Sequence, residues 1–411
     1  MKVAVEELRE ALDSAYNRLM GVYKETSVLA AVRELRSKSL VEIEAWTLLC
    51  ALLDYQVDVI NWLNPMLKGL AIHLTNKGLG LISAYKADLL SKILREFKWV
   101  GRSKGGFKHR FVKIHDILAL TSSIARIIEE YGSIGSFVEE VYQEAVDENH
   151  PEPLGKVIKA LALKLREYGD LPRGFVPDPR HGSAMKRLCL YLRWMTRPYP
   201  DLNIWGFIDK SKLLVSLDSG VARVINRLLG ESVVSGTPSW RDVVNVTRLL
   251  RKINPKDPAK YDYVLSRPAI MKYCTKNPDK RRCYLCPLAR ACQNASLEVP
   301  IKTPSPGERE LISDFLAQYS ERIGIDWHCL EYKLGKRKAD LVFHVSTCEW
   351  WVVEAEVELN YQAIGQAVVY RSLFKNRKGK EPKALIICRH APPELVKACK
   401  IDADIEVIVL S

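Results

Sequence analysis

Four of the ten cysteines fall within nineteen residues: Cys274, Cys283, Cys286 and Cys292. The gaps between them are eight, two and five residues. Four thiolates at such short spacing are typical of a soft metal centre. A zinc ribbon usually has two Cys-x-x-Cys pairs on separate hairpins, whereas this segment has only one such pair. We therefore predict a compact [4Fe–4S] cluster, rather than a zinc ion, held by these four side chains.

The loop between the first two cysteines carries four cationic side chains: Lys276, Lys280, Arg281 and Arg282. A loop that is fixed by a metal centre is ordered before it binds a partner, so its cationic side chains suit the phosphate groups of nucleic acid. The alternative is a run of solvated charges. We predict that these four residues contact DNA.

Two residues further upstream have types suited to covalent chemistry. Lys186 lies in or near the first turn of an expected helix and off its buried face. Positive charge is disfavoured at a helix N-terminus, so we expect a lowered lysine pKa and the neutral amine that imine formation needs. Asp218 occupies the N-cap position before a second helix. The alternatives are a solvated lysine and an ordinary capping aspartate.

The predicted secondary structure that positions these residues changes along the chain from helices alone to a mixture of helices and strands. Apolar residues recur at helical spacing from residue 1 to about 298, and breaks with glycine and basic residues occur at 101–110 and 177–182. Residues 299–307 have the composition of a linker. Beyond it we expect a helix at 308–322, strands at 329–334, 339–345 and 350–357, a helix at 360–374, and strands at 384–388 and 406–410. The sequence therefore predicts a mostly α domain, 1–298, a linker, 299–307, and a small α/β domain, 308–411.

Length and charge agree with a two-domain protein that binds a polyanion. The 411 residues include 62 Lys and Arg against 49 Asp and Glu, a net charge of +13, which favours nucleic acid as partner. The alternative is a merely basic protein. The N-terminal residues lack a secretion signal, and no apolar run approaches the ~20 residues that span a bilayer. We expect a cytoplasmic, nucleoid-associated protein without a membrane partner.

The order of these motifs resembles the endonuclease III branch of the helix-hairpin-helix DNA glycosylases. From about residue 180 to 293, a helical lysine after a glycine-containing turn is followed by Asp, by Val-Ala-Arg-Val-x-x-Arg-Leu and by the four cysteines. The resemblance implies that Lys186 matches the lysine of bifunctional members, Asp218 the essential aspartate and the cysteines the cluster ligands. We also place Gly182 among the DNA-contacting residues. Residues 43–54, 182–194 and 217–230 look more closely like an uncharacterised group of that superfamily.

Three departures from that family leave the substrate open. The usual Leu-Pro-Gly-Val-Gly hairpin is replaced by His181-Gly182-Ser183-Ala184. Asp218 follows Lys186 by 32 positions, and the longer loop carries Trp205. Ser219-Gly220 replaces the Thr-His that often follows the aspartate.

The C-terminal order of helix, three strands, helix and strand resembles the restriction-endonuclease-like nucleases. The resemblance implies a Mg²⁺ site with Asp340 and Glu354, and Gln366 and Tyr370 resemble the family's Gln-x-x-x-Tyr. Glu310 is a further possible ligand, and Glu356 stands where the family has a lysine. Strand alternation puts Glu354, Glu356 and Glu358 on one face. The alternative is a degenerate domain that binds DNA through the cationic runs 336–338 and 375–378.

Together these motifs predict a DNA repair enzyme, a bifunctional DNA glycosylase and AP lyase. Its substrate is double-stranded DNA with a damaged base or an abasic site. Two alternatives stay open. One is a metal-dependent DNA endonuclease whose helical domain recognises structure. The other is a non-catalytic protein that binds damaged DNA.

Overall fold

The computed structural model describes residues 5–20, 29–35, 38–99, 105–169, 171, 174–277, 283, 286–289, 291–295, 306–335, 337–345 and 349–410. Contacts divide the chain into two compact units. Unit 1 comprises Met1–Tyr16, Thr26–Asn277 and Arg290–Ala295, and unit 2 comprises Asn17–Glu25, Pro278–Ala289 and Ser296–Ser411. Most of the predicted linker, residues 299–305, lies outside the described residues.

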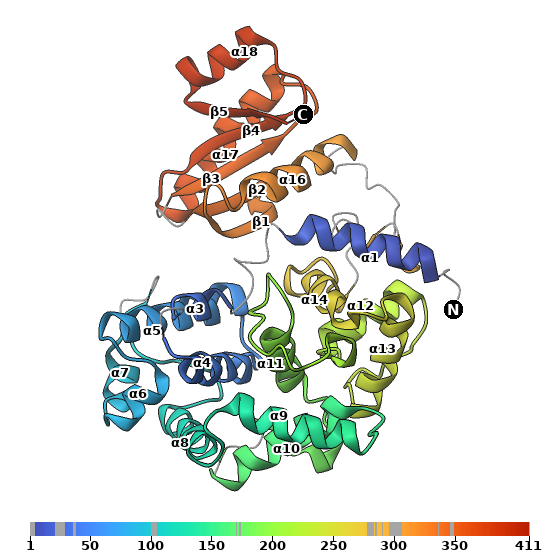
Figure 1. Ribbon diagram of the computed structural model, residues 1–411. Coiled ribbons are helices and arrows are strands. Elements are labelled where there is room, and N and C mark those ends of the chain that lie inside the picture. Colours follow the sequence, from blue (N-terminus) through green and yellow to red (C-terminus); the bar gives the residue numbers. More distant parts are fainter. Residues whose placement is uncertain are drawn as a thin grey trace. The chain divides into compact units, whose positions relative to one another are not determined.

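Unit 1 is helical throughout its described residues, as the apolar spacing predicts (Figure 1). Its helices are α1 (Val5–Leu19, whose last residues belong to unit 2), α3 (Leu29–Arg33), α4 (Leu40–Leu53), η2 (Val59–Leu63), α5 (Asn64–Asn76), α6 (Leu81–Lys86), α7 (Leu90–Glu96), α8 (Ile114–Tyr131), α9 (Ile134–Asp147), α10 (Pro153–Glu167), η3 (Pro179–His181), α11 (Lys186–Thr196), η4 (Lys210–Lys212), α12 (Ser219–Leu229), α13 (Trp240–Ile253), η5 (Pro258–Tyr261) and α14 (Asp262–Ile270).

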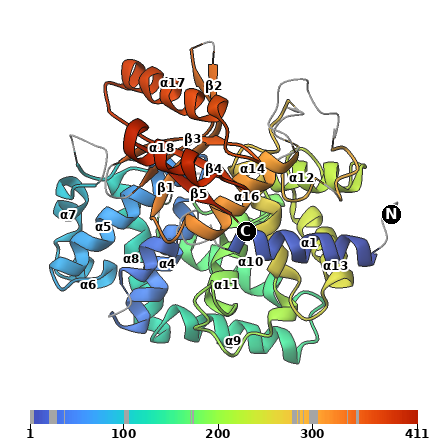
Figure 2. The same ribbon diagram turned by 90° about the horizontal axis from the view of Figure 1, so that it is seen from above.

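Helix α11 lies in the centre of unit 1 and is buried almost all round. It packs against α4 and α10, while α8, α9 and α10 pack on one another (Figure 2). The residues that the helical spacing predicts on its buried face, Met185, Leu188, Cys189 and Leu192, are buried. Two arginines at its C-terminal end are buried as well, and each is neutralised by carboxylates. The pairs are Arg193 with Asp201 and Asp262, and Arg197 with Asp201 and Asp257.

Buried carboxylates also connect the helices around α11. Glu44 of α4 accepts hydrogen bonds from the Trp205 indole (2.8 Å) and from the backbone N–H of Gly135 (3.1 Å) at the start of α9. A Cβ on Gly135 would lie 2.5 Å from the Glu44 carboxylate, so a larger residue would displace it. The long loop that carries Trp205 is therefore packed into the core rather than solvated.

Unit 2 contains a five-stranded mixed sheet with helices on both faces (Figure 1). Strands β1 (Ile325–Leu334), β2 (Arg337–Val345) and β3 (Trp350–Ala355) pair antiparallel, and β4 (Lys383–Cys388) and β5 (Ile405–Val409) continue parallel to β3. One face packs against α17 (Tyr361–Lys378) and α18 (Pro393–Ala398), the other against α16 (Pro306–Tyr319). A short η6 (Cys399–Ala403) precedes β5.

The alternation of side chains along the strands explains the two cores. Val352 faces the core under α17, and its neighbour Val353 faces the core under α16. The predicted helices and strands of this unit are confirmed with shifted ends, and α18 was not predicted. Within the described part of the chain, no helix is both long enough and apolar enough to cross a membrane.

Candidate functional site

Lys186 is the first residue of α11, and its ammonium lies between two carboxylates. Nζ is 2.9 Å from Oδ2 of Asp54 and 3.0 Å from Oδ2 of Asp218. Asp54 is the C-cap of α4, and Asp218 is the N-cap of α12. Three helix ends therefore meet at one amine. The Lys186 side chain is 26% exposed.

The two carboxylate oxygens of Asp218 make different contacts. Oδ1 accepts hydrogen bonds from the backbone N–H groups of Gly220 (2.8 Å) and Val221 (2.9 Å), so the predicted N-cap is confirmed. Oδ2 is left to face Lys186. Burial opposes the charge on Asp218, but the ammonium and the two amides outweigh it, and the Asp218 pKa is lowered.

The expected pKa of Lys186 was wrong in direction. Burial at the helix N-terminus does disfavour the charged amine, but attraction by Asp54 and Asp218 is stronger, and the Lys186 pKa is raised. Two carboxylates in contact outweigh a helix dipole, whose effect is the smaller of the two. The resting lysine is therefore an ammonium that must lose a proton before it can act as a nucleophile.

The C-terminal end of α4 is fixed from two sides. Nη1 of Arg187 donates to the carbonyl oxygens of Leu52 (2.9 Å) and Phe175 (2.8 Å). Nε2 of His109 lies 3.0 Å from the carbonyl oxygen of Leu53, which can only accept, so this nitrogen carries the proton. Burial lowers the pKa of both Arg187, to about 10, and His109. His109 comes from the basic break at 101–110, which thus helps to position Asp54.

Two aromatic rings from the segments after α4 and after residue 105 lie in contact. Tyr55 follows Asp54 in sequence, and its ring lies 5.4 Å from that of Phe111. The guanidinium of Arg187 stacks over Tyr55, and that of Arg110 lies over Phe111. Phe111 is 43% exposed, so it presents an apolar ring with a cationic group beside it.

The turn that leads to Lys186 has an unusual backbone. Gly182 has a φ of 68° and ends η3, and its carbonyl oxygen accepts a hydrogen bond from the N–H of Trp240. Met185, directly before the lysine, has a φ of 51°, a left-handed conformation that a non-glycine residue adopts at a cost. A Cβ on Gly182 would meet nothing within 4 Å, so there is open space beside this predicted DNA-contacting residue.

The far end of α12 contacts the cysteine segment. Arg223 donates to the carbonyl oxygen of Cys274 (3.0 Å), and Arg227 donates to its sulfur (3.2 Å) and to the carbonyl oxygen of Lys276 (3.0 Å). The sulfur of Cys292 lies 3.3 Å from the carbonyl oxygen of Arg227. One helix therefore joins Asp218 to the first and last cysteines.

The middle cysteines belong to unit 2, where the N–H of Cys286 donates to the carbonyl oxygen of Cys283. Among the described residues, no three His, Cys, Asp or Glu side chains form a group that could hold a metal ion. The cluster therefore stays a prediction. Lys280, Arg281 and Arg282 lie outside the described residues.

In unit 2, carboxyl groups from β2 and β3 lie in contact. Asp340 accepts a hydrogen bond from the N–H of Ala355 (2.9 Å), and the Glu354 carboxyl is hydrogen-bonded to Asp340. Burial raises the pKa of both acids, and the proximity of other carboxylates adds to this effect. Glu354 is 4% exposed, and its Oε2 has no hydrogen-bond partner among the described residues.

The other predicted residues of unit 2 lie around this pair with one exception. Glu356 is hydrogen-bonded to Glu308, a residue of α16 that the sequence did not single out. Glu310, the predicted ligand, is exposed. Gln366 donates to the Tyr370 hydroxyl (3.2 Å), and the two acids raise the Tyr370 pKa further than burial alone. Because β3 ends at Ala355, Glu356 and Glu358 lie beyond it, and Glu358 is exposed.

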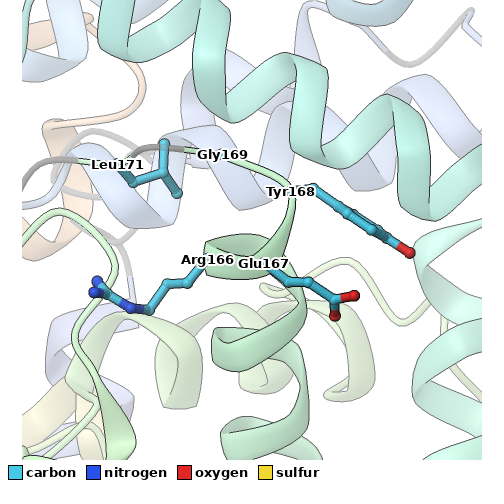
Figure 3. Close-up of a pocket in the computed structure, with 5 residues that line it drawn as sticks. All are labelled: Arg166, Glu167, Tyr168, Gly169 and Leu171. Carbon is cyan, nitrogen blue, oxygen red and sulfur yellow. The ribbon is translucent and has the colours of Figure 1, made fainter.

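A hollow of about 360 Å³ lies at the C-terminal end of α10, lined by Arg166, Glu167, Tyr168, Gly169 and Leu171 (Figure 3). Arg166 donates to the carbonyl oxygen of Val176 and so fixes the loop that also binds Arg187. The hollow contains none of the residues singled out by the sequence.

Comparison with known proteins places this arrangement in a family. Residues 36–271, more than half of the chain, match the model of a family described as a protein of unknown function, DUF2400. The match includes Asp54, Lys186 and Asp218 and ends before Cys274. No curated protein and no solved structure matched the chain. The chain belongs to the DUF2400 family.

Proposed function

We propose that the chain is a DNA repair enzyme, a bifunctional DNA glycosylase and AP lyase with a helix-hairpin-helix glycosylase-like unit 1. The observation that carries this proposal is the Lys186 amine between Asp54 and Asp218, at the meeting point of three helix ends. An amine with carboxylates beside it has the groups needed to form an imine at a sugar carbon. The surplus of 13 positive charges supports double-stranded DNA as the partner.

Each of these residues has its own role in the proposed reaction. The damaged nucleotide is extruded from the duplex, and the exposed ring of Phe111 with Tyr55 offers it a stacking surface. Lys186 attacks the sugar C1′ and the base leaves. Asp218, whose lowered pKa keeps it charged, stabilises positive charge that develops on the sugar. The resulting Schiff base permits cleavage of the strand by elimination.

The four cysteines are proposed to hold a [4Fe–4S] cluster. The guanidinium of Arg227, which donates to the sulfur of Cys274, fits a site with negatively charged sulfur ligands. The cluster would supply structure, since it would order the loop that carries Lys276, Lys280, Arg281 and Arg282. Those cations and Gly182 are then the proposed contacts to the phosphate backbone.

The experiment that tests the proposal is borohydride trapping. Wild-type protein is mixed with duplexes that each carry one damaged base or an abasic site, and borohydride reduces any imine to a stable crosslink. We expect a crosslink with at least one duplex and none with Lys186→Ala. Crosslinking that is the same in both proteins would contradict the proposal.

A second candidate function has an observation of its own. The buried acids Asp340 and Glu354, with the unpartnered Oε2 of Glu354, favour a metal-dependent nuclease with a restriction-endonuclease-like unit 2. These two acids are the residues that would hold Mg²⁺, which would supply charge stabilisation at a phosphate. Gln366 and Tyr370 would position the nucleic acid.

The raised pKa values of the acids predict how unit 2 responds to pH. A folded state that binds protons more tightly than the unfolded chain loses stability as pH rises above the ordinary carboxyl pKa. We expect the free energy of opening of β3 to fall by about 1 kcal/mol or more between about pH 5 and about pH 8 in EDTA. Hydrogen exchange of β3 peptides measures it.

Asp340→Asn should flatten this dependence, whereas Glu358→Gln, which removes an exposed carboxylate beyond the same strand, should leave it unchanged. If the acids hold Mg²⁺, the ion should restore protection at the higher pH in wild type and not in Asp340→Asn. Equal protection with and without Mg²⁺ would speak against the nuclease.

A further inference from the structure

The two carboxylates that contact Lys186 have different surroundings. Oδ1 of Asp218 accepts two backbone N–H groups at the start of α12, which stabilise its negative charge. Among the described hydrogen bonds, the Asp54 side chain accepts only from Lys186 (2.9 Å). Asp54 lies at the C-terminal end of α4, where the helix dipole disfavours negative charge. Asp218 thus has one oxygen committed to backbone amides, whereas Lys186 is the one described hydrogen-bond donor to the Asp54 carboxylate.

We propose that Asp54 is the catalytic base that takes the proton from Lys186, while Asp218 keeps its charge for the sugar. This inference rests on the proposed lyase function and adds a residue to it. Backbone contacts hold Asp54 in place, since Arg187 binds the carbonyl oxygen of Leu52 and His109 binds that of Leu53. The carboxylate can therefore exchange protons without moving away from the amine.

The proton balance needs no other reactant. When the ammonium meets the aldehyde of an opened abasic sugar, one N–H bond breaks and Asp54 receives the proton. The freed electron pair forms the bond from Nζ to C1′, and the carbonyl electrons move to oxygen. That oxygen receives the proton held by Asp54 and a second one from the nitrogen, leaves as water, and an iminium remains. Asp54 ends as it began, a carboxylate.

Two carboxylates face the amine, Asp54 from α4 and Asp218 from α12. Arg187 from α11 and His109 from the segment after residue 105 each interact electrostatically with Asp54. The two acids also stabilise the ammonium, and this attraction on its own predicts a faster reaction when Asp54 is removed, the opposite of the result that we expect. If Asp54 only held the lysine protonated, Asp54→Asn would release more free amine and trapping would become faster.

The experiment is the rate of borohydride trapping on a duplex with a preformed abasic site, measured across pH. The full-length proteins are wild type, Asp54→Asn, Asp54→Ala and Lys186→Ala. Asp58→Asn is the matched control, because Asp58 caps the next helical segment and Asn can replace it as a cap. Native circular dichroism and unchanged affinity for the duplex show that each variant is folded.

We expect Asp54→Asn to trap about 100-fold more slowly than wild type near neutral pH, the effect of losing a general base. Its rate should rise about tenfold per pH unit, because the lysine must then lose its proton to hydroxide. Added formate should accelerate Asp54→Ala and not wild type. Asp58→Asn should behave as wild type.

A rate in Asp54→Asn that equals or exceeds that of wild type, or an Asp54→Ala rate without response to formate, would overturn the assignment of Asp54. In either case trapping by wild type that is lost in Lys186→Ala would leave the lyase function standing. Absence of trapping by wild type would instead remove the lyase function and this inference with it.

Discussion

Cleavage of a preformed abasic site is expected to persist in EDTA and to fall by on the order of 10³-fold or more in Lys186→Ala, because that change removes the nucleophile. A Schiff-base lyase needs no divalent ion, since its electrophile is the sugar and its nucleophile an amine. Carboxylates such as Asp340 and Glu354 act on phosphate only through a metal ion. Gel analysis of an end-labelled duplex measures the cleavage.

Matched variants separate the two units of the chain. Lys186→Arg keeps a cation between Asp54 and Asp218 but forms no imine, so it should be as inactive as Lys186→Ala. Unlike Lys186→Ala, it does not leave the two carboxylates without a cationic partner. The exposed Lys210 provides the control for loss of a lysine charge. The double variant Asp340→Ala and Glu354→Ala should cleave as wild type. Cleavage that EDTA abolishes and that Lys186→Ala retains would establish the nuclease in place of the lyase.

Anaerobically purified protein is expected to be brown and to contain about four irons per chain, as a [4Fe–4S] cluster with four thiolate ligands requires. Cys286→Ala should lose nearly all of this iron. Loss of iron should also weaken DNA binding, because the loop with Arg281 and Arg282 would no longer be fixed. Iron analysis, the visible spectrum and the affinity for duplex DNA provide the readouts.

Cys329→Ala is the matched control, because Cys329 is a partly buried cysteine of β1 outside the four-cysteine segment. It should keep the iron content of wild type. Colourless protein with about one zinc per chain would contradict the cluster and favour a tetrahedral zinc site.

The sequence predicted the local features of the site because those features depend on neighbouring residues. Asp218 precedes a helix whose buried face is spaced at the helical period, so its role as N-cap could be recognised. The position of Lys186 at the start of α11 followed from the turn before it. The positions of the strands of unit 2 along the chain followed from runs of apolar residues separated by turns.

What the sequence missed depends on contacts between distant segments. Asp54 lies 132 positions before Lys186, and only its place directly after the apolar residues 48–53 marks it as unusual. Without knowledge of that contact, we predicted from the dipole of α11 that the Lys186 pKa is lowered. With Asp54 and Asp218 in contact with the amine, the Lys186 pKa is raised. In unit 2, Glu308 of α16 faces the acidic group and Glu310 is exposed, because two residues on a helix point in different directions. Residue spacing in the sequence did not predict which of the two glutamates faces the group.

The most direct measurement is the mass of the peptide that carries the borohydride-reduced sugar. Wild-type protein trapped on an abasic duplex is digested with nuclease and protease, and the modified peptide is sequenced by mass spectrometry. The account predicts a single modified residue, Lys186, and no adduct in Lys186→Arg. An adduct at another lysine or at the N-terminal amine, with Lys186 unmodified, would contradict it.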